Sequence, residues 1–470
     1  MIAASRSDVW LSHDIPADWE DELEVRELGV SRCEQGSAGI IAASDAAARC
    51  VAVTVPQELG TELASLWAAV RRALDNGLRV TLVVQNQEQL SQLLALRAGA
   101  FKVSGEGIDQ RFFPSIELTD DKVPQRFAQE AARHNAGPAD AEVELNTVGD
   151  TEIHEEDRIV LRRALSAHKS AEVECLQNYP GKATRVYRIR AYDEHMVGAI
   201  SYVIKTTPRA GADRETGVFL NTLPDNTPFA NVPPLDPFRS FSTSRRSSIT
   251  TQFVDRAHRF EEFIATNSPA LAVASLFDGP LRCWRSRTRV EVLNVAEHAF
   301  ETVVRKNDQR YAATCDAARL IKSDVRPPQE LVDLLLAEPA RPVPICFSHG
   351  DLHLKNIFVR EGSYETVLID FNRAGFHPSS RDPAELDAAL GFSNVWDDTQ
   401  LQESLYSVPL LSERILCRTE FAPALAIEQL RRQIAGTIAE DEYRIMLACH
   451  CFYWAAKGSV PAYLAIDRLV

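Results

Sequence analysis

Two neighbouring stretches of the chain decide its fold: Ser348-His349-Gly350-Asp351-Leu352-His353-Leu354-Lys355-Asn356-Ile357-Phe358-Val359 and Val367-Leu368-Ile369-Asp370-Phe371-Asn372. Asp351 lies five residues before Asn356, and Asp370 follows an apolar run that is typical of a β-strand. A loop followed by a strand can therefore bring two carboxylates and one amide together. Phosphoryl transfer needs this set, because a carboxylate orients and deprotonates the attacking hydroxyl while oxygen ligands hold Mg²⁺ against the phosphates of ATP.

The two stretches resemble the aminoglycoside phosphotransferase and choline kinase group, which shares the protein-kinase-like fold. The first reads H-G-D-x-x-x-x-N from His349 to Asn356, and the second reads I-D-F-x-x-x-G from Ile369 to Gly375. The resemblance implies that Asp351 is the catalytic base and that Asn356 and Asp370 hold Mg²⁺. It also implies that His349 packs beneath the loop and fixes its shape.

Two positions favour the small-molecule branch of this fold. A protein kinase would have Arg immediately before the catalytic Asp and Gly two residues after the metal-binding Asp. This chain has Gly350 and Asn372 instead. We therefore expect ATP and Mg²⁺ as cofactors and the hydroxyl of a small molecule as the acceptor.

A hydrolytic metal site is the rival interpretation, because His349, Asp351 and His353 alternate along the chain. Alternating His and Asp on a strand would face one way and could bind zinc or iron. Gly350 breaks such a strand, and we expect His377 to lie in a turn with Pro378 and two serines. We expect His353 to be an ordinary hydrogen-bonding residue.

The nucleotide-anchoring half is expected upstream. The apolar, β-branched run Val197–Lys205 predicts a strand that ends in a lysine. It resembles the strand whose lysine contacts the α- and β-phosphates of ATP. Glu215, ten residues later, is the candidate for the helix glutamate that pairs with Lys205.

A hairpin is expected before that strand, where Asn178-Tyr179-Pro180-Gly181-Lys182-Ala183-Thr184-Arg185 separates two strand-like runs. In the related fold this hairpin covers the nucleotide phosphates. The family usually has two or three glycines there, whereas this chain has only Gly181. Lys182 is the candidate that supplies charge in place of missing backbone donors.

Two further positions follow from the resemblance. The chain is expected to cross from the small lobe to the large lobe after the run Ile249–Val254, so adenine would bind backbone groups between Gln252 and Val254. Asp382 precedes Pro383 and an apparent helix, so an N-cap role is physically sufficient. In related phosphotransferases the corresponding Asp steadies the catalytic loop.

The patterns predict an α/β domain followed by an α+β, bilobal, protein-kinase-like domain. Residues 1–120 alternate strand and helix, which indicates a parallel sheet of the receiver, flavodoxin or Rossmann kind. The strand before Pro56 ends without the phosphate-accepting Asp of a receiver. Residues 121–156 are expected to form a linker, 157–254 the small lobe and 255–470 the helical large lobe.

Composition limits the possible partners. The net charge of -15 and the absence of a basic block argue against nucleic acid. The nine cysteines are scattered without a C-x-x-C pair, which favours buried thiols in a reducing compartment. No signal peptide or membrane span is evident. We therefore expect a cytoplasmic protein that binds no membrane.

Two other functions stay open at this point. The chain could be a protein Ser/Thr kinase of a multi-domain signalling or defence system. It could also be a catalytically weak nucleotide-binding module whose N-terminal domain recruits a protein partner. The complete set of Asp351, Asn356 and Asp370 favours catalysis, whereas the glycine-poor hairpin favours the module.

Overall fold

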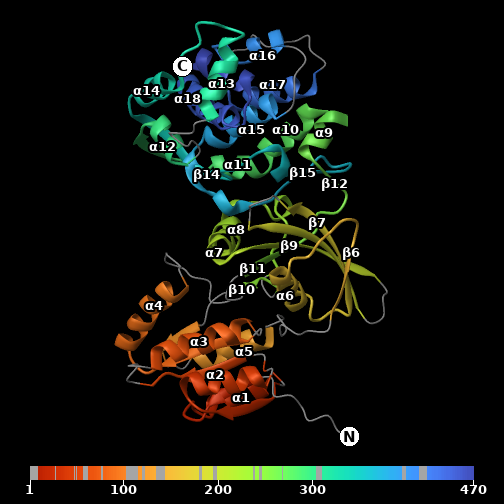
Figure 1. The fold of residues 1–470 in the computed structure, drawn as a ribbon, viewed down its shortest axis with the longest axis vertical. Coiled ribbons are helices and arrows are strands. Elements are labelled where there is room, and N and C mark those ends of the chain that lie inside the picture. The colour runs from red at the N-terminus through yellow and green to blue at the C-terminus, as the bar shows by residue number, and fades with distance from the viewer. Residues whose placement is uncertain are drawn as a thin grey trace. The chain divides into compact units, whose positions relative to one another are not determined.

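The computed structural model describes most of the chain in two compact units (Figure 1), residues 1–220 with 234–253 and residues 221–233 with 254–470. The described residues are 9–26, 28–46, 48, 50–56, 62–75, 78–101, 115–118, 122–133, 143–178, 183–193, 198–236, 239–242, 246–266, 268–302, 310–393, 399–411 and 421–470.

The first unit begins with a five-stranded parallel sheet in the order β2-β1-β3-β4-β5. Its strands are β1 (Val9–Ser12), β2 (Val30–Cys33), β3 (Cys50–Thr54), β4 (Arg79–Val84) and β5 (Ser115–Leu118). Every residue of β3 and β4 is buried. Such continuously apolar strands are expected where helices cover both faces of a parallel sheet.

Helices cover both faces of this sheet (Figure 1). One face packs against α1 (Asp18–Glu24) and α5 (Val123–Arg133), where the rings of Trp19 and Phe127 lie 5.4 Å apart. The other face packs against α2 (Gly36–Asp45), α3 (Glu62–Asp75) and α4 (Gln87–Phe101). The strand order is that of the flavodoxin-like doubly wound folds, so the predicted α/β class is confirmed.

The sheet that follows has the order β10-β11-β9-β8-β7-β6. Its strands are β6 (Glu144–Thr147), β7 (Ser170–Asn178), β8 (Arg185–Tyr192), β9 (Ala199–Pro208), β10 (Phe241–Ser242) and β11 (Arg246–Gln252). Neighbouring strands are antiparallel except for β6 and β7, which are parallel. The parallel pair needs a crossover, and α6 (Glu155–Ala164) supplies it.

The segment 121–156, expected to be a linker, therefore contributes to both parts of the first unit. Its helix α5 places Phe127 in the core of the first sheet, and its strand β6 extends the second. The pattern Glu144–Thr147 is short and polar, and its residues are mostly exposed. Local sequence could not show this strand, because β6 is specified by pairing with β7.

Helix α6 is held on both sides by buried charged residues. Asp157 is fully buried and accepts hydrogen bonds from Arg185 (2.9 Å), Tyr187 (2.9 Å) and Arg246 (3.0 Å). Arg163 donates from Nη1 to the carbonyl of Leu74, 2.6 Å away, at the end of α3. A guanidinium there also complements the partial negative charge of a helix C-terminus.

The second unit is mainly helical and contains two three-stranded antiparallel sheets. The sheets are β12 (Ala257–Arg259) with β15 (Ile357–Arg360) and β16 (Thr366–Leu368), and β13 (Arg289–Leu293) with β14 (Arg341–Ser348) and β17 (Gly375–Pro378). The helices are α8 (Leu223–Asn226), α9 (Phe260–Thr266), α10 (Pro269–Asp278), α11 (Pro280–Arg285), α12 (Val295–Thr302), α13 (Arg310–Arg319), α14 (Pro328–Leu336), α15 (Arg381–Phe392), α16 (Thr399–Leu405), α17 (Ala422–Ile434), α18 (Glu440–Ala455) and α19 (Val460–Leu469). Together with the second sheet of the first unit, this α+β region confirms the predicted kinase-like fold class.

A buried ion pair joins three of these helices. Arg431 of α17 donates from Nε to Oδ2 of Asp387 in α15 at 2.7 Å. Tyr443 of α18 and Tyr406 donate to the same carboxylate at 2.6 Å and 3.0 Å. Because the charge is paired and hydrogen-bonded, it can remain in a core that excludes water.

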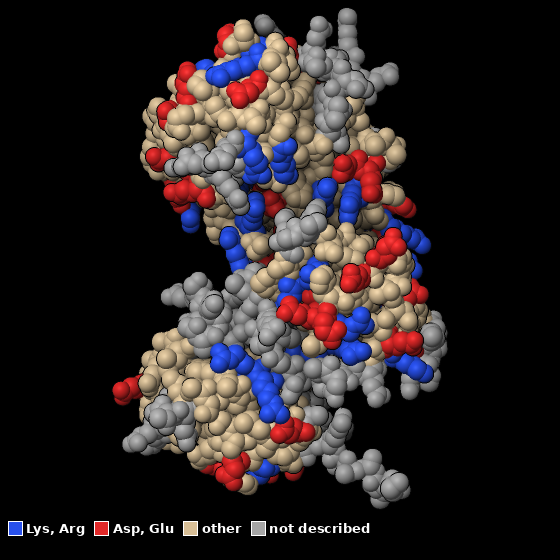
Figure 2. Space-filling model, in the orientation of Figure 1, with Lys and Arg blue, Asp and Glu red and all other residues tan. Residues whose placement is uncertain are grey.

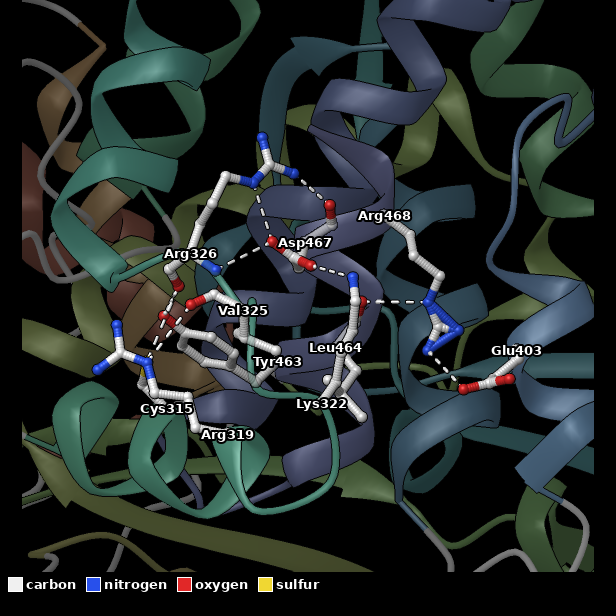
Figure 3. A network of polar contacts seen from close by, with 10 residues as sticks. All are labelled: Cys315, Arg319, Lys322, Val325, Arg326, Glu403, Tyr463, Leu464, Asp467 and Arg468. Atoms are coloured by element: carbon white, nitrogen blue, oxygen red, sulfur yellow. Dashed lines mark hydrogen bonds and ion pairs between the residues drawn. The ribbon is translucent and has the colours of Figure 1, made fainter.

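A second polar network fastens α19 to the segment that follows α13 (Figure 3). Asp467 accepts hydrogen bonds from Arg326 Nε at 2.9 Å and Lys322 Nζ at 3.0 Å. Tyr463 donates to the carbonyl of Arg326 at 3.0 Å. Burial by itself would raise the pKa of Asp467, but the hydrogen bonds from Arg326 and Lys322 outweigh burial and lower this pKa.

No helix among the described residues is long and apolar enough to cross a membrane. The eight cysteines that lie in the described part of the chain are free, and Cys449 and Cys451 are buried in α18.

Asp467 makes the stability of the second unit depend on pH. A folded-state pKa below the unfolded value, about 3.9, means that the carboxylate stabilises the fold above about pH 4 and loses this contribution as pH falls through the folded pKa. We expect Asp467→Asn to lower the melting temperature at pH 7 and this deficit to shrink on acidification. Thermal melts between pH 7 and pH 3 measure it, with the exposed Asp316→Asn as the control. A deficit that is constant with pH would contradict the expectation.

Candidate active site

The geometry of the site begins with the β15–β16 hairpin. Its register pairs Ile357 with Leu368, so the residues just outside the hairpin, Asn356 and Ile369, are also neighbours. The N–H of Ile369 donates to the carbonyl of Asn356 at 3.1 Å. Asp370, the next residue, is thereby held beside Asn356.

His349 links the same position to the preceding loop. Its Nε2 lies 2.8 Å from the carbonyl oxygen of Ile369, so this nitrogen carries the proton and donates. The fully buried imidazole also packs at 5.0 Å from the ring of Phe371. His349 thus lies under the loop and ties it to the segment that carries Asp370.

Asp382 holds the backbone of the loop. Its carboxylate accepts the N–H of His349 at 2.7 Å and that of Gly350 at 2.9 Å. The helix α15 begins two residues earlier than expected, at Arg381 instead of Pro383, so Ser380 occupies the N-cap position. The N-cap interpretation of Asp382 was therefore wrong, because its side chain turns to the loop instead of capping its own helix. Burial raises the pKa of Asp382, although His349 and the two N–H groups oppose this.

Gly350 is required by its conformation and by its neighbour. Its φ is +73°, and a Cβ built there would lie 2.3 Å from the carbonyl oxygen of Arg373. No side chain fits, which explains why this chain cannot carry the arginine that protein kinases have before the catalytic Asp. Instead Arg381 of α15 donates from Nη2 to the carbonyl of Gly350 at 3.0 Å.

Asp351 and Asn356 are joined through the loop. The amide Nδ2 of Asn356 donates to the backbone carbonyl of Asp351 at 2.9 Å. The other amide atom, Oδ1, is an oxygen of the kind that Mg²⁺ prefers. Asp370 has left-handed backbone angles, with φ 64° and ψ 67°. Such a conformation is uncommon for a residue other than glycine, and it often marks functional sites.

Arg373 lies against the predicted base. Its Nη1 is 3.2 Å from Oδ1 of Asp351. Sequence reasoning missed this contact, although Arg373 is only three residues after Asp370. The 3₁₀ turn Phe371–Arg373 reverses the chain, and no local pattern shows which way its last side chain points.

His353 does not converge with His349 on a common ligand. Its Nδ1 accepts the N–H of Lys355 at 3.3 Å, and its Nε2 lies 4.0 Å from Oδ2 of Asp351. Burial lowers the pKa of His353, although Asp351 opposes this. Among the described residues, no group of three or more His, Cys, Asp or Glu side chains could hold a metal ion. His377, expected in a turn, lies in strand β17 and pairs with Cys346.

The other candidates, apart from Val254, belong to the first unit. Lys205 of β9 and Glu215 of α7 (Arg209–Gly217) form an ion pair with Nζ and Oε2 2.7 Å apart, and both side chains are largely buried. Gly181 and Lys182 lie outside the described residues. The N–H groups of Gln252 and Phe253 donate to the carbonyls of Pro234 and Ser201. Of the backbone donors expected for adenine, Val254 then remains as the candidate.

A glycine pair provides a test of the loop. We expect Gly350→Ala to lower the melting temperature clearly more than Gly362→Ala. Gly362 has φ +79° but no atom within 4 Å of an added Cβ, so its substitution carries only the backbone strain. That strain costs roughly 1 kcal/mol or more, and the close approach to Arg373 adds to it. Equal losses in differential scanning calorimetry would show that the close approach relaxes at little cost.

One region of the chain matches a known family model. Residues 287–403, which contain the loop and the hairpin, match the family model described as the phosphotransferase enzyme family. No curated protein matches the chain.

Several solved structures resemble the chain at a distance. An aminoglycoside phosphotransferase from Streptomyces rimosus is 15% identical over 61% of this chain and 92% of its own, with a TM-score of 0.35. An aminoglycoside-3'-phosphotransferase of type VIII is 18% identical over 65% and 99%, with a TM-score of 0.36. An ethanolamine kinase from Plasmodium vivax is 14% identical over 66% and 86%, with a TM-score of 0.35. At these TM-scores none of them identifies a substrate.

Proposed function

Residues 287–403 carry the signature of the phosphotransferase enzyme family, and from this premise we propose that the protein is an ATP- and Mg²⁺-dependent kinase that phosphorylates a hydroxyl group of a small molecule. One observation supports this function above all. The hydrogen bonds at Ile369 hold Asp370 and Asn356 side by side, and Asn356 in turn holds the backbone of Asp351.

In the proposed reaction Asp351 acts on the acceptor. Its carboxylate accepts a hydrogen bond from the acceptor hydroxyl and takes the proton as the oxygen attacks the γ-phosphorus of ATP. A new O–P bond forms, and the bond between the γ-phosphorus and the β,γ-bridging oxygen breaks, so ADP leaves with the electron pair. Because the transition state is loose, the carboxylate serves chiefly to position the hydroxyl.

The oxygen atoms beside Asp351 fit a hard cation. The amide nitrogen of Asn356 donates to the carbonyl of Asp351, so the amide oxygen of Asn356 is the atom that would bind a cation. Asp370 adds a carboxylate. Mg²⁺ bound there would neutralise charge on the ATP phosphates. We propose Asn356 and Asp370 as its protein ligands.

All of the proposed nucleotide contacts except Val254 belong to the first unit. The ion pair with Glu215 fixes the position of the ammonium group of Lys205. Binding of this group to the α- and β-phosphates then costs little side-chain conformational entropy. Gly181 and Lys182 are proposed to cover the phosphates, and backbone groups at Gln252 to Val254 are proposed to bind adenine.

We propose a supporting role for the N-terminal α/β domain, as a scaffold or sensor that binds a protein partner. At the carboxyl edge of its sheet, the hydroxyl group of Thr54 donates a hydrogen bond to the carboxylate of Asp14. The N–H of Thr54 donates a second hydrogen bond to Oγ of Ser12 at 3.0 Å. Pro56 stands where a receiver would need its phosphate-accepting Asp. These hydroxyl and carboxyl groups hydrogen-bond to one another, which supports a domain that is not phosphorylated at this edge.

We propose a cytoplasmic protein without a nucleic-acid partner. Free, mostly buried cysteines suit a reducing compartment. Lys and Arg side chains are interspersed with Asp and Glu on the face that Figure 2 displays, and the net charge is -15. Phosphate backbones bind best to contiguous basic surfaces.

Transfer of labelled γ-phosphate from ATP tests the proposal. Purified protein is incubated with Mg²⁺ and either a metabolite extract or a protein extract. Label in a small molecule supports the proposed function. Label in protein would favour a protein kinase. Nucleotide binding without transfer would favour a nucleotide-binding module.

Asp370→Asn tests the metal site. We expect Mg²⁺-dependent ATP turnover to fall by at least 100-fold while the melting temperature stays close to that of the wild type, because an amide binds Mg²⁺ without neutralising it. Asp333→Asn, on the exposed face of α14, is the control. Turnover near the wild-type rate at millimolar Mg²⁺ would remove Asp370 from the metal site.

Asp351→Ala tests the base. We expect kcat to fall by about 100-fold or more, with the Kd for ATP changed less than about threefold, because other residues hold the nucleotide. Stopped assays give kcat, and isothermal calorimetry gives the Kd. Equal losses of turnover and ATP binding, with a lower melting temperature, would mean that Asp351 maintains the loop instead.

A further inference from the structure

Three side chains near the start of α15 form hydrogen bonds with the backbone of the loop at residues 349–352. Arg381 bonds the carbonyl of Gly350, and Asp382 bonds two N–H groups of the same segment. Glu385 adds a third attachment, because its Oε2 accepts the N–H of Leu352 at 3.1 Å. Positions 381, 382 and 385 lie on one face of a helix, so one turn presents all three groups to the loop.

The bond from Glu385 acts on the peptide group that follows Asp351. The carbonyl of this peptide belongs to Asp351 and is held by Nδ2 of Asn356 at 2.9 Å. Its N–H belongs to Leu352 and is held by Glu385. A peptide group is planar, so fixing both its oxygen and its hydrogen fixes the orientation of the whole plane. The buried side chain of Leu352 anchors the far end.

We propose that Glu385 is a positioning residue for Asp351, holding the Asp351–Leu352 peptide from the side opposite Asn356 and so aiming the catalytic carboxylate. This inference rests on the proposed function, since Asp351 is the base only if the protein is a kinase. Neither the family motif nor local sequence assigns this role to Glu385. The reason for its importance is geometric, because a displacement of a reacting group by about 1 Å can cost 100-fold in rate.

Charges around Glu385 decide the form in which it acts. The charged groups that face it are Asp351, Arg381, Asp382 and Arg373. Burial, followed by the charge of Asp351, raises the pKa of Glu385 to about 8. At neutral pH this carboxyl group is therefore mostly protonated, and it holds the N–H of Leu352 without placing a second negative charge beside Asp351.

Two substitutions separate the hydrogen bond from the charge. Glu385→Gln keeps an acceptor oxygen and resembles the protonated acid. Glu385→Met keeps the length of the side chain but removes the acceptor. Glu365→Gln, on an exposed strand-flanking residue, is the matched control. Thermal melts establish that each variant is folded.

Hydrogen exchange of the full-length protein tests the hydrogen bond between Leu352 and Glu385 without requiring activity. We expect the amide of Leu352 to exchange at least tenfold faster in Glu385→Met than in the wild type, and to remain within about threefold in Glu385→Gln, because a lost hydrogen bond of about 1.4 kcal/mol corresponds to a tenfold change. Wild-type exchange in Glu385→Met would overturn the proposal.

Turnover then tests the effect on Asp351. We expect kcat in Glu385→Met to fall by about 10- to 100-fold with the KM for ATP within about twofold, and kcat in Glu385→Gln to stay within about fivefold of the wild type. An inflection of kcat near pH 8 in the wild type should be absent in Glu385→Gln. Equal kcat values in the two variants, or an inflection that persists in Glu385→Gln, would contradict the positioning role.

The two levels of the inference fail separately. If the wild type transfers no phosphate to any acceptor or to water, the proposed function is wrong, whatever the exchange data show. If the wild type is active, but Glu385→Met has the wild-type exchange rate at Leu352 and the wild-type kcat, the proposed function stands and the proposed role of Glu385 is wrong.

Discussion

The site depends on one small arrangement, the two hydrogen bonds made by the peptide groups of Ile369. Its N–H binds the carbonyl of Asn356, and its carbonyl binds Nε2 of His349. The first bond extends the β15–β16 ladder by one step, and the second adds a buried imidazole from the loop. Loop and hairpin are thereby fixed to a single residue, and Asp370 follows it directly.

A helix supplies the complementary constraint. Near the start of α15, the side chains of Arg381, Asp382 and Glu385 form hydrogen bonds with the backbone of residues 349, 350 and 352. A loop without its own secondary structure leaves its N–H and C=O groups unpaired, and unpaired buried groups are costly. The polar side chains of this helix turn satisfy them, so the loop holds one conformation, in which Gly350 has left-handed angles.

One of these relations could be predicted, and the reason is the resemblance to the kinase-like fold. The resemblance implies that Lys205 and Glu215, ten residues apart, form a pair, and the structure has the ion pair at 2.7 Å. The strand itself continues past Lys205 to Pro208. The contact of Arg373 with Asp351 and that of Glu385 with Leu352 could not be predicted in this way. Each joins segments whose meeting depends on how a turn or a helix is placed by the rest of the core.

The sequence by itself determined the classes of structure and the chemical inventory, namely a parallel α/β domain, a kinase-like domain and the motif residues Asp351, Asn356 and Asp370. Hydrophobic periodicity and motif spacing are local properties, so they can be read along the chain. Only the tertiary structure decided that residues 144–147 pair with β7, that Arg373 contacts Asp351, and that Glu385 faces the peptide after Asp351. These outcomes depend on which buried polar groups meet across distant segments, because each group must find a partner that its own neighbours in sequence cannot provide.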